Sequence, residues 1–384
     1  MGKSSHMPIT IHPVVTKTDQ HLFYDLAWRV YQKDPCWVPA LWPQRKDYLN
    51  KKTTFFSYGE GDFWLAKRGS EVVGTIGAAV DHPRNHHLGR QSCLFGFFEV
   101  LEDDYEAASA LWDQACIWAK THHLTELVGP YSFAANEDTG FLVEGFQYPP
   151  TIMMGHNPPY YPQFAEKYGF QKSAEWLAYR YDLKTINFDV QNGPGILFRI
   201  AQRSRQRLGQ SSIRHPDMRR WDEEIHRLHT VYNTSLADLP DFFPIELVEF
   251  NAQAIALKPI LDPELVFIAE VDGKVVGFSL GLPNLMEALK EAHGLRDPWD
   301  YLRFAQARRK ITGVSFKILA IDPQYWGYGL ESQMFLEMAK TVIRKGYTWI
   351  DGSLTGDTNP QTNKLATRLG AYVYRRYWEF KLVF

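Results

Sequence analysis

The sequence contains few cysteines and no long apolar run. Cys36, Cys93 and Cys116 are odd in number and widely spaced, which excludes a disulfide framework and does not match the cysteine spacing of a zinc site. No stretch approaches the roughly 18 apolar residues that span a bilayer, and the first residues lack the apolar segment of a secretory signal. We therefore expect reduced thiols and a cytoplasmic protein.

An excess of charge of one sign is also missing. The 42 basic and 44 acidic residues give a net charge of −2, so the chain as a whole has no field that attracts nucleic acid or an anionic membrane, and such a partner would need a local patch. Seven arginines lie between positions 199 and 220: Arg199, Arg203, Arg205, Arg207, Arg214, Arg219 and Arg220. They could contact phosphates of nucleic acid or coenzyme A, or lie on solvated helix faces, and we favour the last reading. We expect no membrane partner and no nucleic acid, and a homodimer remains open.

The length and a long-period repeat indicate two domains. The chain has 384 residues, about twice the usual domain size. Trp64-Leu65-Ala66 with Val72-Val73-Gly74 matches Phe267-Ile268-Ala269 with Val275-Val276-Gly277 at a constant offset of 203. Each copy has the pattern of two strands joined by a tight turn. Duplication is our interpretation, and unrelated domains that share a common hairpin are the alternative.

A second match supports this interpretation. Helical patterns that end at Gly169 and Gly370, the expected C-terminal caps, precede aromatic-rich strand patterns at an offset of 201. The turn-rich cluster Asn192-Gly193-Pro194-Gly195 then predicts a boundary between domains at 8–190 and 195–384. Helices and strands are mixed in each half, so the expected fold class is α/β, with layered sheets flanked by helices.

The most informative motif follows an apolar strand pattern at 314–321. Asp322-Pro323 ends this strand, because proline cannot donate to a sheet, and Gly327 and Gly329 follow. Apolar residues then recur at helical spacing, among them Met334, Met338 and Val342. A strand, a glycine turn and a helix N-terminus bring unpaired backbone N–H groups together at the positive end of the helix dipole. This geometry binds a diphosphate.

The motif Gln324-x-x-Gly327-x-Gly329 resembles the coenzyme A loop of the GNAT acetyltransferase superfamily, and the hairpin at 271–277 resembles that family's second and third strands. The resemblance implies that the strand pairs with the pantetheine arm, that the loop holds the pyrophosphate, and that an amine attacks the thioester directly. The co-substrate would be acetyl-CoA or another acyl-CoA, without a metal. The implied cofactor-binding residues are Leu319, Ala320, Ile321, Gln324, Tyr325, Trp326, Gly327, Tyr328, Gly329 and Leu330. Asn359 would bond the pantetheine or, as an alternative, cap a helix.

The first half resembles a degenerate copy of the same fold. Its corresponding strand, at 93–100, continues into Leu101-Glu102-Asp103-Asp104-Tyr105, which is acidic and has no glycine. Acidic side chains would repel phosphate, so this half is expected to serve as scaffold or pocket wall. The whole chain resembles bacterial tandem GNAT-like proteins and, more distantly, double-domain peptidyltransferases that use aminoacyl-tRNA.

The catalytic groups of many relatives are absent at the matching positions. Ser315 stands where those relatives place a carboxylate base, and Ala366 stands where they place a tyrosine acid. The long irregular stretch 129–162 offers Glu137 and Glu144 as replacements, because such stretches are commonly functional, although these residues could equally be solvated acids of a connection. Asp351, in the strand after the glycine-turn helix, is a further candidate base.

Two further features of the sequence are a cluster of histidines and a helical insertion. His82, His86 and His87 are expected in a hairpin loop, and no zinc site is expected there because no cysteine or matched acidic residue accompanies them. A helical insertion at 284–310 replaces a short connection, and it could be a lid or an interface.

Three functions fit the sequence. We favour an N-acyltransferase, most readily an N-acetyltransferase, that uses acyl-CoA and a small amine or amino-acid-like acceptor. The second is a non-catalytic acyl-CoA-binding or sensing protein, which the missing acid and base make credible. The third is a peptidyltransferase that uses aminoacyl-tRNA, supported only by the arginines.

Overall fold

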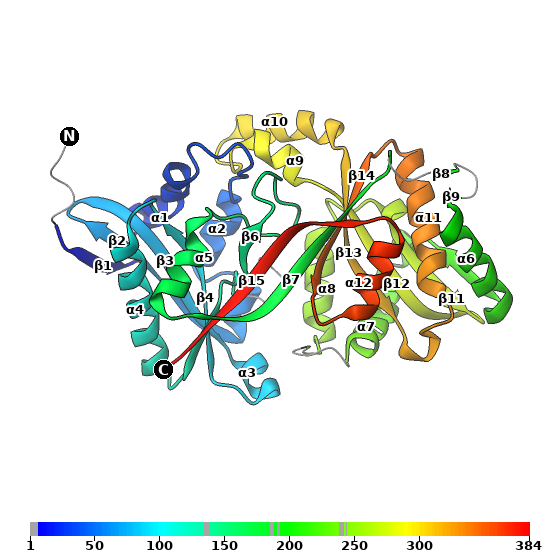
Figure 1. The fold of residues 1–384 in the computed structure, drawn as a ribbon, viewed down its shortest axis with the longest axis horizontal. Helices are drawn as coiled ribbons and strands as arrows, with labels where there is room; N and C mark the ends of the chain where they lie inside the picture. Colours follow the sequence, from blue (N-terminus) through cyan, green and yellow to red (C-terminus); the bar gives the residue numbers. More distant parts are fainter. Residues whose placement is uncertain (1–6, 134–138, 185–187, 190–192, 238–241, 243) are drawn as a thin grey trace. The chain divides into compact units, whose positions relative to one another are not determined.

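A computed structural model describes residues 7–133, 139–184, 188–189, 193–237, 242 and 244–384. Contacts divide the chain into two compact units. Unit 1 contains the chain up to Leu177 with Met286–Arg309 and Tyr374–Phe384, and unit 2 contains Ala178–Leu285 and Lys310–Val373. Two strands, β7 (Gln171–Asp182) and β15 (Tyr372–Val383), contribute residues to both units. Each unit mixes helices and strands (Figure 1), so the predicted α/β class is confirmed.

Unit 1 is built on a sheet with the strand order β1-β2-β3-β4-β5-β15, in which β6 also pairs with β15. Its strands are β1 (Ile9–Pro13), β2 (Gly59–Arg68), β3 (Glu71–Asp81), β4 (Ser92–Val100), β5 (Glu126–Gly129) and β6 (Phe141–Glu144). Its helices are α1 (Lys17–Val30), α2 (Trp42–Leu49), α3 (His82–Leu88), α4 (Tyr105–Thr121), α5 (Tyr160–Tyr168), α9 (Met286–Leu289) and α10 (Pro298–Ala307), with 3₁₀ turns η1 (Thr54–Ser57) and η4 (Lys290–Ala292).

Unit 2 has the strand order β7-β14-β13-β12-β11-β10. Its strands are β10 (Ser211–Arg214), β11 (Val266–Val271), β12 (Lys274–Pro283), β13 (Gly313–Ile321) and β14 (Trp349–Gly356), with a separate pair β8 (Phe188–Asp189) and β9 (Gly193–Pro194). Its helices are α6 (Gly195–Leu208), α7 (Trp221–Leu236), α8 (Leu247–Leu257), α11 (Leu330–Arg344) and α12 (Pro360–Arg368), with 3₁₀ turns η2 (Met218–Arg220), η3 (Pro263–Leu265) and η6 (Pro323–Tyr325). The 3₁₀ turn η5 (Arg308–Lys310) has residues in both units.

The two repeated hairpins share their register irregularity as well as their sequence. In β2–β3, Ala66 pairs with Gly74 and the register shifts after Ala66. In β11–β12, Ala269 pairs with Gly277 and the register shifts after Ala269. Both bulges therefore fall at the same point of the repeat, 203 residues apart, and bulges are retained features rather than accidents of folding.

The three histidines at 82–87 lie in a helix, and the expected loop is wrong. Asp81 caps α3, because its carboxylate accepts a hydrogen bond from Arg84 N, and His82 follows at the first helical position with a proline after it. Gly89 closes the helix in the left-handed conformation. An aspartate cap, an early proline and a terminal glycine are together a complete set of helix signals. The described residues contain no group of three or more His, Cys, Asp or Glu that could hold a metal.

Within the part of the chain that the structure describes, no helix has both the length and the apolar character to cross a bilayer.

Candidate active site

The glycine turn joins β13 to α11 in unit 2, as its sequence pattern predicts. Asp322 caps η6 by accepting a hydrogen bond from Gln324 N at 3.0 Å, and the Trp326 indole donates to Ile321 O at 2.9 Å. Gly327 and Gly329 have φ of +79° and +82°, a region that glycine enters without the cost paid by other residues. Hydrogen bonds of the Asp322 and Trp326 side chains therefore hold the turn, and the two glycines allow the chain to change direction there.

The amides of the turn are free to bind an anion. Among the described residues, the backbone N–H groups of Gly327, Gly329 and Leu330 donate no hydrogen bond to the protein. A Cβ built on Gly327 would meet nothing within 4 Å, so the approach to these amides is open. Unpaired donors at a helix N-terminus are the expected surroundings of a phosphate. The turn thus fits the pyrophosphate of a coenzyme A.

Helix α11 is held by its buried face and by the arginine-rich helix beside it. Leu330, Met334, Met338 and Val342, spaced four apart, are at most 2% exposed and pack into one apolar cluster. On another side α11 lies against α6, where Gln333 Nε2 donates to Ser204 Oγ at 2.8 Å. A Cβ on Gly329 would come within 3.2 Å of Ser204 Cβ. Packing on both sides fixes the direction in which the N-terminus points.

Strand β13 separates from β14 next to this turn. The parallel pairing runs from Gly313 opposite Trp349 to Phe316 opposite Gly352, and no further register partners join the two strands among the described residues. On the other edge of β13, the pairing with β12 passes from Phe316 to Ile318, which leaves Lys317 as an extra, bulged residue. Beyond Phe316, the five remaining residues of β13 therefore have no strand register partner in β14 among the described residues, which leaves an edge where the extended arm of a ligand could form strand-like hydrogen bonds.

A buried ion pair lies where the strands separate. Lys317 Nζ is 3.4 Å from Asp351 Oδ2, and the side chains are 7% and 0% exposed. Asp351 is the register partner of Ser315, whose buried hydroxyl has no hydrogen-bond partner. Buried charges persist only when they are paired and hydrogen-bonded. The sequence had indicated Asp351 as a candidate base. It had not indicated Lys317, although a lysine inside an apolar strand pattern could have pointed to a functional residue.

The other candidate residues that the structure describes have the settings of structural residues. Glu137 lies outside the described residues. Glu144, at the end of β6 in unit 1, is 65% exposed and pairs with Arg376 Nε at 3.2 Å, which is the setting of a solvated structural acid. Asn359 caps α12, because its Oδ1 accepts a hydrogen bond from Thr362 N at 3.2 Å. Ala366 is buried in α12 and supplies no acid.

The corresponding turn of unit 1 is closed by the protein's own side chains. At the end of β4, Val100 N donates a hydrogen bond to the Tyr161 hydroxyl at 2.7 Å, and the Tyr160 hydroxyl donates to Val100 O at 2.7 Å. Asp104 caps α4 by accepting from Ala107 N, and Arg68 pairs with Asp104 at 2.8 Å. A carboxylate and a phenol therefore stand where an anionic ligand would need donors.

Beside Val100, unit 1 contains a partly buried carboxylate that no sequence pattern indicated. Glu99 accepts hydrogen bonds from Tyr161 at 2.8 Å and Tyr31 at 3.3 Å. Burial raises the pKa of Glu99 to about 7, although these hydrogen bonds oppose the rise. The group is therefore a polar part of the core whose charge depends on pH.

Several arginines of the 199–220 run belong to structural ion pairs. Arg205 pairs with Glu337 at 3.2 Å, and Arg214 pairs with Glu224 and Glu270, each at 2.8 Å. Arg220 pairs with Glu223 of the next helical turn. These ion pairs account for Arg205, Arg214 and Arg220 as structural residues of unit 2.

Comparisons with known proteins agree with the fold. A solved structure described as a tandem GNAT protein from the clavulanic acid biosynthesis pathway matches 98% of both chains with a TM-score of 0.58 and 14% identity, so the chain has the tandem GNAT fold. The chain belongs to the family of the bacterial ceramide synthase of Caulobacter vibrioides, which is 30% identical over 385 residues and covers 97% of both chains. The protein YghO of Escherichia coli is 26% identical over 374 residues, covering 96% of this chain and 93% of YghO. No family model matches the chain.

Proposed function

We propose that this protein transfers an acyl chain from acyl-CoA to the primary amine of a long-chain amino alcohol and so forms an amide. The observation that carries the proposal is the separation of β13 from β14 beside a glycine turn with free amides, within a chain that matches a ceramide synthase along 97% of its length. A ceramide is an amide of a fatty acid with such an amino alcohol.

The residues of unit 2 have distinct parts in this reaction. The amides of Gly327, Gly329 and Leu330 would bind the pyrophosphate, and the free edge of β13 would hold the pantetheine arm, so that the thioester lies near Lys317 and Asp351. The amine nitrogen attacks the thioester carbonyl, the C–N bond forms, the C–S bond breaks, and the thiolate takes up a proton. An ammonium acceptor must first lose a proton, and Asp351, whose Oδ2 is 3.4 Å from Nζ of the bulged Lys317, is our candidate for the base.

Apolar surroundings support a lipid-like acceptor over a small polar amine. Ile318, in the part of β13 beyond the pairing with β14, packs against the same apolar cluster as Tyr232 of α7 and Phe250 of α8, and all three side chains are partly exposed. Helix α8 is rich in apolar residues yet has no buried residue, and Val248 is 83% exposed. An alkyl chain that packs on a surface of this kind is removed from water, which is energetically favourable.

We also infer that residues 8–190 form a second GNAT-like domain that has lost its coenzyme turn, and that residues 195–384 form the acyl-CoA-binding domain. The shared register of the two hairpins supports duplication. The Tyr161 and Asp104 contacts at the end of β4 support the loss of the ligand site.

The proposal is tested by following free thiol release and amide product. The protein is given acyl-CoA of two, eight and sixteen carbons with either a long-chain amino alcohol or a short one such as ethanolamine. Turnover is expected with the long amino alcohol and a fatty acyl-CoA. Thiol release only with acetyl-CoA and small amines would replace the proposal with the acetyltransferase reading, and acyl-CoA binding without any product would replace it with a binding protein.

The role of Asp351 is tested separately with Asp351→Asn. General base catalysis contributes about 10²- to 10⁴-fold, so turnover should fall by roughly that factor while acyl-CoA still binds. Glu144→Gln, which changes an exposed acid of unit 1, is the matched control and should keep full turnover. Equal turnover in wild type and Asp351→Asn would leave positioning alone to account for catalysis.

A further inference from the structure

The insertion between β12 and β13 carries a helix whose outward side is apolar. Asp300 is 1% exposed and is the only buried residue of α10 among those described, with Phe304 and Ala307 half-buried beside it. At about 100° per residue these three lie on one side of the helix. The opposite side presents Trp299 and Leu302, which are 69% and 50% exposed.

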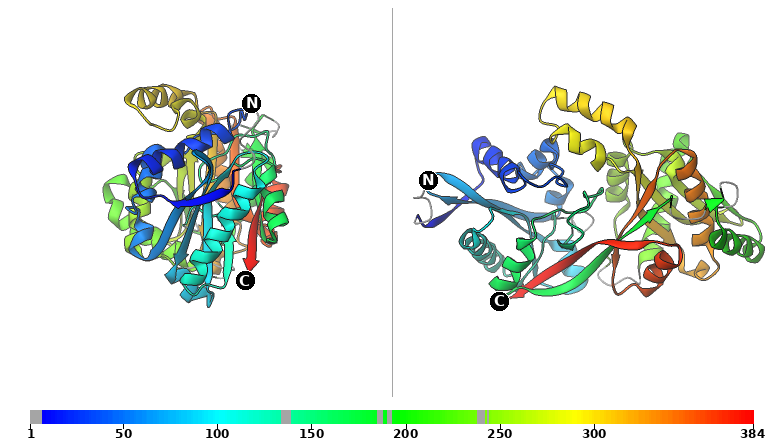
Figure 2. Two further views of the ribbon diagram at one scale, coloured as in Figure 1. Left: turned by 90° about the vertical axis from the view of Figure 1, so that its left-hand side faces the viewer. Right: turned by 45° about the horizontal axis from the view of Figure 1, so that its top comes forward.

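This outer side contains no charged residue. Its six members are Pro298, Trp299, Tyr301, Leu302, Ala305 and Gln306. A surface helix of a soluble domain normally turns charged residues outward and apolar residues inward, and α10 reverses that pattern. Helix α10 packs against α9 (Figure 2), and all six residues of its outer side are exposed.

The helix is held firmly in this orientation. Asp297 caps it with hydrogen bonds from Trp299 N and Asp300 N. Asp300 accepts from Arg296 N at 2.9 Å and pairs with Arg303 at 3.0 Å. Because these contacts use the buried side, the apolar outer side is not free to turn inward.

Positive charge flanks the apolar side. Arg308 and Arg309 follow the helix directly, are exposed, and form no ion pair with any residue that the structure describes. Lys46 of α2 is exposed and also lacks an ion pair within the described ranges. Cations of this kind attract the anionic headgroups of a lipid bilayer.

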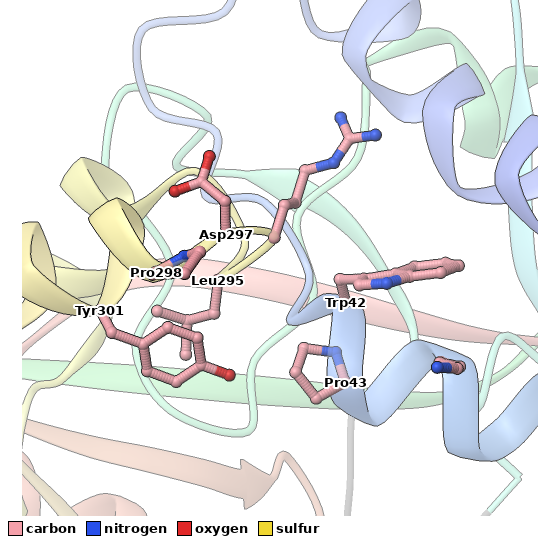
Figure 3. A pocket seen from close by; sticks show the side chains of 8 residues that line it. Trp42, Pro43, Leu295, Asp297, Pro298 and Tyr301 are labelled. Atoms are coloured by element: carbon pink, nitrogen blue, oxygen red, sulfur yellow. The ribbon is translucent and has the colours of Figure 1, made fainter.

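A cavity opens beside the same side. It has a volume of about 450 Å³ and lies between α2 and the segment that leads into α10. Trp42 and Pro43 face Leu295 and Tyr301 across it (Figure 3). The rest of its lining consists of Lys46, Arg296, Asp297 and Pro298, two cations and one anion among them. Tyr301 belongs to both the cavity and the outer side of α10, so the apolar surface continues into the cavity.

We infer that the outer side of α10, with the neighbouring cavity, docks on an anionic lipid bilayer. Tryptophan and tyrosine favour the boundary between headgroups and acyl chains, and a helix that combines them with flanking arginines lies in the plane of that boundary. This inference goes beyond the proposed function, because docking requires neither acyl-CoA nor an amine.

The experiment measures binding of the full chain to vesicles by co-sedimentation, without substrates. Phosphatidylcholine vesicles are compared with vesicles that also contain phosphatidylglycerol, at low and high salt. The wild type should bind the anionic vesicles, and salt should weaken binding. Trp299→Ser/Leu302→Ser should bind at least about tenfold more weakly, and Arg308→Gln/Arg309→Gln also about tenfold more weakly.

Ile117→Ser is the matched control, because Ile117 is 56% exposed on α4 of the same unit. It should bind vesicles like the wild type, and all variants should keep the wild-type melting temperature, since the changed side chains are exposed. Failure of the wild type to bind anionic vesicles, or equal binding by Trp299→Ser/Leu302→Ser, overturns the inference. So does a wild-type dimer that this variant converts to a monomer without any vesicle binding, because a second copy of the chain would then cover α10.

Discussion

Replacing Gly327 with alanine separates the two properties of the glycine turn, its backbone conformation and its ligand binding. At φ +79° an L-residue costs roughly 1–2 kcal/mol, and the added Cβ meets no protein atom within 4 Å. The stability loss should therefore stay near that cost. Any relaxation of the turn moves the amides of Gly329 and Leu330, and a hydrogen bond to a charged group contributes about 1.5–3 kcal/mol. The Kd for acyl-CoA should rise by roughly 10- to 100-fold.

Gly346 supplies the matched control at the other end of α11. Its φ is +80°, and a Cβ there also meets nothing within 4 Å. Gly346→Ala should thus lose the same stability and keep wild-type affinity. The assays are thermal unfolding and titration calorimetry with coenzyme A and an acyl-CoA. The assignment of the turn is refuted if Gly327→Ala binds as tightly as the wild type, or if both variants lose affinity equally.

Three further predictions follow from buried and helix-end carboxylates. Burial raises the pKa of Glu99 to about 7, above its unfolded value, so the folded state holds the extra proton and the free energy of unfolding should fall as pH rises from about 5 to 8. Glu99→Gln should flatten this dependence and be more stable than the wild type at pH 8 by on the order of 3 kcal/mol, as checked by urea unfolding at both pH values. Glu331 adds a negative charge to the first turn of α11, so Glu331→Gln should bind coenzyme A about threefold more tightly in calorimetry. Because burial raises the pKa of Glu331, that advantage should shrink as pH falls, and an advantage that grows in acid would contradict the placement of the ligand. Lys317→Met leaves Asp351 without its cation, so it should destabilise the fold by about 3–5 kcal/mol, and an unchanged melting temperature would show that the pair is not structural.

The features that sequence predicted are those fixed by neighbours along the chain. The proline after β13, the two glycines and the apolar spacing of α11 specify a strand, a turn and a helix within about 30 residues. The bulge positions of the two hairpins likewise follow from short matching segments. Helix α3 is likewise specified by residues next to it in the chain, its N-cap Asp81 and its terminal Gly89, so it could have been predicted in place of the loop.

The features that sequence missed depend on segments that are distant in the chain. Lys317 becomes the bulged residue only through the register that β12 imposes, and its partner Asp351 is 34 residues away. Glu99 becomes a partly buried acid because Tyr31 and Tyr161 enclose it. The net charge of −2 is a sum over the whole chain. It therefore could not indicate that the exposed side of α10 is apolar and flanked by arginines.

Because of the tyrosine contacts at the end of β4, a bound ligand should change hydrogen exchange at the turn of unit 2 and not at the corresponding turn of unit 1. Tyr161 and Tyr160 already satisfy Val100 N and O, so the Val100 N–H is protected from hydrogen exchange whether or not acyl-CoA is present. The amides of Gly327, Gly329 and Leu330 have no such protection until a ligand arrives. Exchange rates measured with and without coenzyme A should slow at the start of α11 and stay constant at Val100, so the coenzyme governs the local stability of one turn while side chains permanently fix the other.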